Sequence, residues 1–328
     1  MASRDGNGWV NCALGHRHWG KFGAAGLLAY AGGPGDPDGI SDPAILLQRR
    51  VGWSHHGGTW GLPGGAADSH ESAVEAALRE AAEECAVPPD ALVVRGIYAD
   101  DHGGWAYHTV FASAVAPFEA YPASEETDDA AWVPAHAAAD LDLHPGLAAH
   151  WPELREGLGP LTVIVDAANV VGSRPDGWWR DRVGAARRLV LGVAALSTRG
   201  VTEFPAALRL PTSARWFPEF VLVLEGQARA AADTAGAAAV VEDPRAEGAA
   251  RRAVGVGAAR GAAGAGDERL RIVRAPGSGD DMIAEWAGTP PGRRLVVTAD
   301  RELRSRCEAA GAVVTGPRWL TDQLDKPR

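Results

Sequence analysis

The stretch GLPGGAADSHESAVEAALREAAEECAV, residues 61–87, carries the most detailed pattern in the first half of the chain. Ser72 followed three residues later by Glu75 is a capping box, which predicts that a helix begins just after Ser72. The prolines at 88 and 89 cannot continue a helix and predict its end near residue 86. Before the helix, Gly64 and Gly65 predict a tight turn that lets the backbone approach what the helix presents.

The predicted helix separates acidic residues from apolar ones. At about 100° per residue, one face carries Glu80, Glu83 and Glu84. Another face can pack inward and carries Val74, Leu78, Ala81 and Cys85. Like-charged side chains three or four positions apart repel one another by a few tenths of a kcal/mol. The crowding therefore indicates either a solvated acidic surface or a cation that neutralises the carboxylates.

The spacing around the helix matches a longer motif. From Gly65 there are five residues to Glu71, then seven to the pair Arg79-Glu80, then two to the pair Glu83-Glu84. This pattern resembles the Nudix box, G-x5-E-x7-R-E-U-x-E-E-x-G-U, and residues 60–65 match the W-x-L-P-G-G pattern that usually precedes it. Ala86 stands where the family has its last glycine, which affects how the helix ends.

The resemblance to MutT-like Nudix hydrolases covers about residues 15–155 and implies an α/β/α sandwich with a mixed sheet. It implies Mg2+- or Mn2+-dependent hydrolysis of a nucleoside triphosphate or of a nucleoside diphosphate linked to another group. The implied metal ligands are Glu80, Glu83 and Glu84, one of which could orient the attacking water. Arg79 would orient these glutamates, and Glu71 would be structural or an outer ligand. Mg2+ prefers carboxylate oxygens and keeps waters and phosphates as its other ligands.

The substrate and the general base stay open at this level. The side chains that could stack on a base, or could equally be packed structural residues, are Trp19, Trp53 and His56. A later acidic loop could supply the base or be merely solvated; it contains Glu125, Glu126, Asp128 and Asp129.

Length and charge predict two domains. A chain of 328 residues fits about two domains. Residues 1–159 hold 8 Lys and Arg against 22 Asp and Glu, a net charge of −14, whereas residues 160–328 hold 24 against 20, a net charge of +4. We therefore expect a Nudix domain at 1–156 and a second domain at 160–328.

The cysteines and the hydropathy pattern bear on the compartment. The three cysteines lie far apart in the sequence, which favours a reducing cytoplasm. No apolar run approaches the roughly 20 residues that span a bilayer, so we expect no membrane partner.

Apolar runs predict the strands of both halves. Those of the first half, at 24–30, 44–50, 92–98, 106–116 and 130–134, predict a mixed sheet around the helix. Those of the second half, at 161–165, 220–224, 271–273, 294–297 and 312–314, alternate with helix-length segments and predict a parallel sheet covered on both faces. The Ala-, Gly- and Arg-rich stretch 228–266 predicts one helix and a loop.

Acidic residues follow four of the second-half runs, and ligands of parallel sheets bind outside the carboxyl ends of the strands. The opening D-x-x-N, GSGDDMI and VVTADREL resemble the NYN (YacP-like) branch of the PIN-like nucleases, over about residues 160–320. This resemblance implies a PIN-like, Rossmannoid sheet and a Mg2+- or Mn2+-dependent ribonuclease site from Asp166, Asn169, Glu225, Asp280, Asp281 and Asp300. RNA is then the implied partner, although the site could bind RNA or a nucleotide without cleavage.

Residues 172–182, GSRPDGWWRDR, follow the first acidic strand. Arginines beside aromatic residues suit single-stranded nucleic acid, but the tryptophans could equally close the core. The residues concerned are Arg174, Trp178, Trp179, Arg180 and Arg182.

The function that these patterns favour is a Nudix pyrophosphohydrolase fused to a PIN-like NYN domain with ribonuclease or RNA-binding activity. Two alternatives remain. One is a regulator whose Nudix fold senses a nucleotide without turnover, against which the retained glutamates argue. The other is an RNA-end-processing protein whose Nudix half acts on RNA ends.

Overall fold

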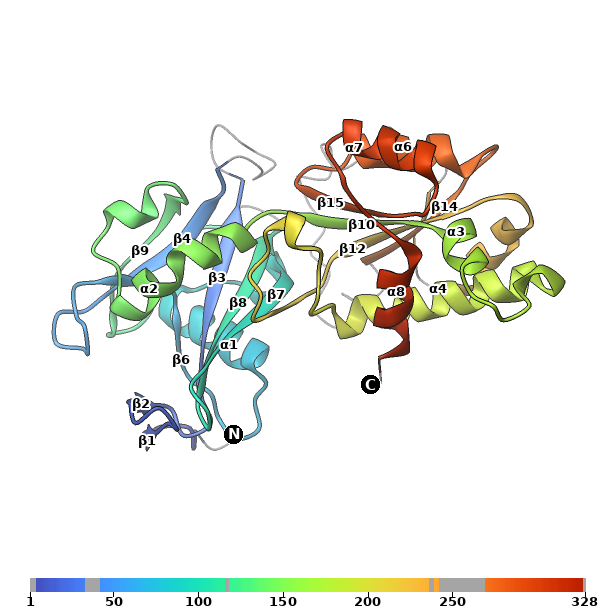
Figure 1. Ribbon diagram of the computed structural model, residues 1–328. Coiled ribbons are helices and arrows are strands. Elements are labelled where there is room, and N and C mark those ends of the chain that lie inside the picture. Colours follow the sequence, from blue (N-terminus) through green and yellow to red (C-terminus); the bar gives the residue numbers. More distant parts are fainter. Residues whose placement is uncertain (1–3, 33–41, 116–117, 236–238, 242–268, 327–328) are drawn as a thin grey trace. The chain divides into compact units, whose positions relative to one another are not determined.

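The computed structural model describes residues 4–32, 42–115, 118–235, 239–241 and 269–326 (Figure 1). The chain divides into two compact units, Met1–Gly159 with Leu210–Trp216, and Pro160–Arg209 with Phe217–Arg328. Most of the stretch 228–266, for which a helix and a loop are expected, lies outside the described residues; its described start belongs to a 3-10 helix, Gly226–Ala235. Within the described ranges, no helix is long and apolar enough to cross a membrane.

The first unit is built on a mixed sheet in the order β11-β7-β8-β3-β4-β5, with β6 paired to β3 and β9 paired to β4. The β3–β8 pair is parallel, and its neighbours in the sheet pair antiparallel. The strands are β3 (Ala24–Ala31), β4 (Ala44–Arg50), β5 (Trp60–Gly61), β6 (Gly64–Ala66), β7 (Leu92–Asp101), β8 (Ala106–Ala114), β9 (Thr127–Pro134) and β11 (Ala214–Trp216). A separate two-stranded hairpin pairs β1 (Trp9–Asn11) with β2 (Arg17–Trp19).

Two helices cover this sheet. Helix α1 (Ala73–Cys85) packs on the face that carries the alternate β3 residues Ala25, Leu27 and Ala29. Because successive strand residues point to opposite faces, the intervening positions of β3 and β8 face away from α1. Helix α2 (Pro145–Leu154) buries Leu147, Trp151 and Leu154. The α/β/α sandwich with a mixed sheet predicted from the sequence is confirmed.

Helix α1 begins as its sequence predicts and ends on a strained residue. The Ser72 side chain accepts from the Glu75 backbone N–H, and the Glu75 carboxylate accepts from the Ser72 N–H at 2.8 Å, which confirms the capping box. At the other end Ala86 has φ 55° and ψ 30°, a left-handed conformation. This conformation places the Cβ of an L-residue too close to the following carbonyl oxygen. The alanine therefore carries strain that a glycine would not.

We expect Ala86→Gly to raise the free energy of unfolding of this unit by about 1 kcal/mol. The gain comes from relief of left-handed strain and is reduced by the greater entropy of glycine in the unfolded chain. Thermal denaturation of the two proteins measures it. The matched control is Ala82→Gly in the middle of the same helix, which should lower stability by about 1 kcal/mol. A loss of stability in Ala86→Gly would contradict the strain argument.

Strand β11 comes from far along the sequence. It pairs antiparallel with β7, so that Trp216 lies opposite Gly96. Trp216 is 3% exposed, and its ring lies 5.0 Å from that of Phe111. A Cβ on Gly96 or on Gly157 would meet this ring at 2.6 Å. Residues 210–216 thus complete the first unit, although the sequence analysis placed them in the second domain.

The second unit is built on a parallel sheet in the order β13-β14-β12-β10-β15-β16. The strands are β10 (Leu161–Asp166), β12 (Glu219–Leu224), β13 (Ala239–Val241), β14 (Leu270–Arg274), β15 (Arg293–Val297) and β16 (Val313–Thr315). All the pairs are parallel, which confirms the predicted parallel sheet. The chain order reverses at β10, the position where such sheets form a crevice at the strand ends.

Helices lie on both faces of this sheet (Figure 1). Helices α6 (Gly279–Gly288) and α7 (Arg301–Ala309) pack on a face that includes Ile164, Val223 and Val296. Helices α3 (Ala167–Gly172), α4 (Arg182–Arg199) and α8 (Pro317–Asp325) complete the unit. The doubly wound arrangement brings the loops after β10, β12 and β15 to one edge of the sheet.

Candidate active site

Glu84 is a buried carboxylate held by two donors. It is 6% exposed, although it lies on the acidic face of α1. Its Oε2 accepts hydrogen bonds from the Gly64 backbone N–H at 2.7 Å and from Nε2 of Gln48 at 2.8 Å. Burial raises the pKa of this carboxyl to about 8, because the two donors only partly offset the loss of solvation and Glu80 adds repulsion. The solvated-surface interpretation does not hold for this residue.

Arg79 forms ion pairs with the other acidic residues of the motif. Its Nε and Nη2 contact the two carboxylate oxygens of Glu71 at 2.6 and 2.8 Å. Its Nη1 lies 2.6 Å from Glu80 and 3.5 Å from Glu83. The guanidinium hydrogen bond lowers the pKa of Glu71, whereas burial raises the pKa of Glu80 despite its contact with Arg79. Glu83 also pairs with Arg4. One arginine therefore positions three carboxylates.

Gly64 and Gly65 lie in strand β6 and not in the tight turn expected from the sequence. Because these two residues have no side chains, neighbouring segments can approach their backbone closely. A Cβ on Gly64 would meet the Ala25 carbonyl oxygen at 2.4 Å, and a Cβ on Gly65 would meet the Glu80 carboxylate at 2.8 Å. Neither residue has a positive φ. The missing side chains are required because α1 and β3 press against this strand.

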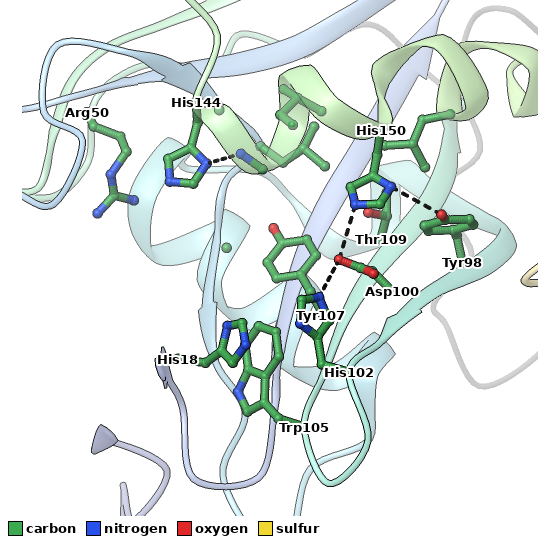
Figure 2. A pocket seen from close by; sticks show the side chains of 16 residues that line it. His18, Arg50, Tyr98, Asp100, His102, Trp105, Tyr107, Thr109, His144 and His150 are labelled. Carbon is green, nitrogen blue, oxygen red and sulfur yellow. Dashed lines mark hydrogen bonds and ion pairs between the residues drawn. The ribbon is translucent and has the colours of Figure 1, made fainter. Parts of the chain in front are cut away.

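A cavity of about 310 Å³ has Arg50, Tyr107 and His144 among its lining residues (Figure 2). Gly64, whose N–H holds Glu84, belongs to its wall. Aromatic and imidazole rings form much of the remainder, from Tyr98, Trp105, Tyr107, His18, His102, His144 and His150. Arg50 also lines it and favours the charged form of Glu84. The cavity therefore combines flat apolar walls with the positively charged guanidinium of Arg50 near the buried Glu84 carboxylate.

Asp100 is an acidic group in the same wall. Its Oδ2 lies 3.0 Å from Nε2 of His102 and 3.1 Å from Nε2 of His150. His144, at the start of α2, has its pKa lowered to about 4, mainly by burial and also by nearby His56, Arg50 and His55. His144 is therefore neutral near pH 7.

The base-stacking candidates from the sequence fall in different places. Trp53 is 72% exposed, and Trp19 stacks edge-on against Trp9 in the hairpin. The ring of His56 lies 4.9 Å from that of His144, a cavity residue. In the acidic loop, Glu125 and Glu126 are exposed, and Asp128 pairs with Arg49 at 2.6 Å.

Sequence reasoning missed Gln48 and Arg50 on β4. Gln48 is 1% exposed and also accepts a hydrogen bond from the Thr127 hydroxyl at 2.7 Å, so it links β9 to Glu84. A glutamine directly after the apolar run AILL, where a buried strand continues, is the sequence signal that could have indicated it.

In the second unit, Asp166 ends β10 and is 4% exposed. Its Oδ2 accepts hydrogen bonds from Nδ2 of Asn169 and from the Thr298 hydroxyl, both at 2.8 Å. Asn169 in turn accepts from the Ala299 N–H at 3.3 Å. Thr298, which sequence reasoning missed, is fully buried. These bonds tie the end of β10 to the loop after β15.

Asp280 interacts electrostatically with the other acidic residues that follow the strands. Burial raises its pKa, and repulsion from Asp166, Asp300 and Glu225 raises it further. Glu225 accepts from the Gly279 N–H at 2.7 Å, and Asp300 caps α7 by accepting from the Leu303 N–H at 2.8 Å. The carboxylates of Asp166, Glu225 and Asp300 thus lie within electrostatic reach of Asp280.

Asp281 lies apart from this group, because its side chain is 82% exposed and pairs with Arg306 at 2.7 Å. Of the aromatic and basic residues after β10, Trp178 lines a hollow of about 220 Å³ together with Glu225 and Arg182. Trp179 is 57% exposed. Arg174 pairs with Asp325 at 3.0 Å.

Comparison with known proteins concerns the first half of the chain. The NUDIX domain family matches residues 37–154. A "Putative 8-oxo-dGTP diphosphatase 3" of Mycobacterium tuberculosis is 46% identical over 165 residues, 48% of this chain and 72% of that protein. A "Nucleoside triphosphate pyrophosphatase/Nudix hydrolase fusion protein" of Bifidobacterium longum is 39% identical over 158 residues, 48% of this chain and 32% of that protein. The crystal structure of the Nudix hydrolase RenU from M. smegmatis shares 44% identity over 46% of this chain and 94% of that one, with a TM-score of 0.42.

This chain is 46% identical to the mycobacterial relative and covers 72% of its length, which establishes the family. Through its N-terminal half, this chain belongs to the Nudix hydrolases, enzymes that act on anhydrides in phosphorus-containing substrates.

Proposed function

We propose that the Nudix half is a metal-dependent pyrophosphohydrolase of nucleoside triphosphates. The observation that carries this proposal is the buried Glu84 carboxylate beside a ring-lined cavity that also contains Arg50. A nucleotide needs both features, a flat apolar surface for its base and neutralised charge for its phosphates. Among nucleotides, we propose oxidised guanine nucleotides as the first candidates, because the mycobacterial relative is named for 8-oxo-dGTP.

The donor set fits a hard divalent cation. Carboxylate oxygens are the ligands that Mg2+ and Mn2+ prefer, and the proposed ligands are Glu80, Glu83 and Glu84. Burial raises the pKa values of Glu80 and Glu84, so their ionised forms lack compensation in the protein alone. When bound, the ion would neutralise phosphate charge and activate the water that attacks phosphorus.

The protein residues supply the positioning. Arg79 holds Glu71, Glu80 and Glu83 in one arrangement, and Gly64 with Gln48 fixes Glu84. Arg50 would bind a phosphate oxygen, since it carries the positive charge of the cavity wall beside Glu84. Trp105 and Tyr107 would contact the base. Water would break the anhydride bond between the α- and β-phosphorus atoms and release a nucleoside monophosphate and pyrophosphate.

A substrate screen with Mg2+ or Mn2+ tests this function. It compares 8-oxo-dGTP with dGTP, the other nucleoside triphosphates, ADP-ribose, sugar nucleotides, dinucleoside polyphosphates and capped RNA. We expect the highest kcat/KM for 8-oxo-dGTP, with a monophosphate and pyrophosphate as products. Preferential turnover of capped RNA would instead favour the RNA-end-processing alternative. Nucleotide binding without turnover would favour the regulatory one.

For the second half, we propose a PIN-like NYN domain that cleaves single-stranded RNA with Mg2+ or Mn2+. The grouping of Asp166, Glu225 and Asp300 around Asp280, at the carboxyl edge of a parallel sheet, supports this proposal. Asn169 would keep Asp166 oriented. Asp281, which is engaged by Arg306, would serve outside the metal site. The exposed Trp179 and the net charge of +4 suit an RNA strand.

We expect Mg2+ or Mn2+ to raise the melting temperature of this domain, because a cation relieves the repulsion around Asp280. Asp166→Asn should weaken that gain and abolish metal-dependent RNA cleavage, while nucleotide hydrolysis by the Nudix half continues. Calorimetry and a labelled single-stranded RNA measure both effects. Asp281→Asn is the matched control and should leave the metal-induced shift intact. An unchanged shift in Asp166→Asn would remove Asp166 from the site, and metal binding without cleavage would leave only an RNA- or nucleotide-binding role.

A further inference from the structure

A cluster of one thiol and three imidazole side chains, none of which belongs to the Nudix motif, lies at the N-terminal hairpin. It consists of Cys12, His16, His18 and His102, whose candidate ligand atoms all lie within 4.8 Å of one another. Cys12 follows β1, His16 precedes β2 and His18 lies on β2, whereas His102 follows β7. The cluster therefore joins two segments that are about 90 residues apart in the sequence.

Polar groups surround the Cys12 sulfur. Burial acts to raise the pKa of this thiol, but hydrogen bonds from the backbone of His16 and Leu14 and from His102 outweigh it, and the pKa is lowered. The Cys12 N–H also bonds to the His16 carbonyl oxygen at 3.0 Å, which closes the turn around the sulfur. Backbone N–H groups directed at a sulfur stabilise the negative charge that a metal ligand needs.

The histidines are already oriented as ligands. Nε2 of His102 contacts Asp100 at 3.0 Å, which leaves Nδ1 facing the Cys12 sulfur at 3.9 Å. A carboxylate on the far nitrogen is the usual outer partner of a metal-bound histidine. The His18 ring stacks on Trp105 at 3.9 Å between centroids. Its Nε2 is buried and, within the described part of the chain, has no hydrogen-bond partner.

The hairpin has a small apolar core, and hydrogen bonds such as that from the Ala13 N–H to the Gly103 carbonyl oxygen at 2.8 Å connect it to the rest of the unit. Strands β1 and β2 pair over three residues each, and a two-stranded hairpin alone is marginally stable in water. Among the described residues, the buried apolar cluster beneath it consists of Cys12, Ala24 and Trp105, packed with Val10 and Tyr107. The large side chains that stay exposed are Trp9, Leu14, Trp19 and Phe22. Small units of this kind are commonly stabilised by a metal.

We propose that Cys12, His16, His18 and His102 bind one Zn2+ ion. One thiolate and three imidazoles suit zinc, and four protein ligands make a closed, structural site. The ion links the hairpin to the turn between β7 and β8. His18 and His102 also line the nucleotide cavity, so the zinc fixes one of its walls.

The metal content of the full chain, purified without a histidine tag and dialysed against Mg2+, tests the site. We expect one zinc per chain, a melting temperature that falls on chelation, and a cobalt-thiolate absorption band after Co2+ replacement. Cys12→Ser should lose the band and the zinc. His16 is exposed, so His16→Ala leaves the core intact and should weaken zinc binding by at least about tenfold.

Two controls separate this site from the other histidines and carboxylates. His55→Ala removes an exposed histidine outside the cluster, and Glu84→Gln alters the Nudix carboxylates; both should retain one zinc. Wild-type protein with well below one zinc per chain after growth with zinc would overturn the proposal. Zinc content and affinity unchanged in both Cys12→Ser and His16→Ala would overturn it as well.

Discussion

Glu84→Gln is expected to lower nucleotide hydrolysis by at least about 100-fold, the scale lost with a key electrostatic group. Glutamine keeps the shape of the side chain, and its carbonyl oxygen can still accept from the Gly64 N–H and from Gln48. The change thus removes a charge that the proposed cation needs while it leaves the local packing in place. Single-turnover hydrolysis at saturating Mg2+ measures the effect. Near-wild-type turnover would exclude Glu84 as a ligand.

The same variant should alter how stability depends on pH when divalent cations are removed. The pKa of Glu84 is about 8 in the folded protein and near 4.5 in an unfolded chain. Between these values the folded protein holds a proton that the unfolded chain releases. The stabilisation from this group is therefore complete below about pH 4.5 and is lost as the pH rises through about 8. From about pH 5 to about pH 8 the loss is roughly 3 kcal/mol.

Calorimetry in a chelator across this range compares the two proteins. The wild-type melting temperature should fall more steeply with rising pH than that of Glu84→Gln, because glutamine has no proton to release. With Mg2+ present, the affinity of the wild type for the cation should increase toward pH 8 as Glu84 ionises. Parallel pH curves in the chelator would show that Glu84 is not held protonated by burial.

Trp216→Ala is expected to lower the stability of the Nudix unit by about 3–5 kcal/mol, the usual loss for a buried tryptophan. The ring packs against Phe111 and over Gly96 and Gly157, so truncation leaves a cavity that these residues cannot fill. A fragment ending at residue 156 lacks β11 altogether and should be less stable than the same unit in the full chain.

The temperature at which nucleotide hydrolysis is irreversibly lost gives the stability of this unit alone. Trp179→Ala is the matched control, because that side chain is 57% exposed and belongs to the second unit. It should leave the inactivation temperature unchanged. If Trp216→Ala did so as well, residues 210–216 would not contribute to the Nudix core.

In the second half, local sequence patterns predict the acidic residues of the candidate site only in part. The acidic residues after each apolar run, together with the rule that parallel strands end at one edge, predict a grouping of carboxylates, and repulsion from Asp166, Asp300 and Glu225 contributes to the raised pKa of Asp280. Sequence could not distinguish Asp280 from Asp281, since neighbouring residues on a helix point in different directions. The contact of Asp281 with Arg306 comes from the packing of α6 beside α7.

For the Nudix half, the family, the sandwich fold, the boundaries of α1 and the spacing of its glutamates could all be predicted from the sequence. These follow from residues close together in the chain, through capping, helical periodicity and a fixed motif. The burial of Glu84, its contacts with Gln48 and Gly64, the cavity wall that four histidines share with Asp100, and the completion of the sheet by β11 all depend on the tertiary structure. Burial and pKa shifts depend on neighbours that the fold brings from distant positions, and no local pattern in the sequence records them.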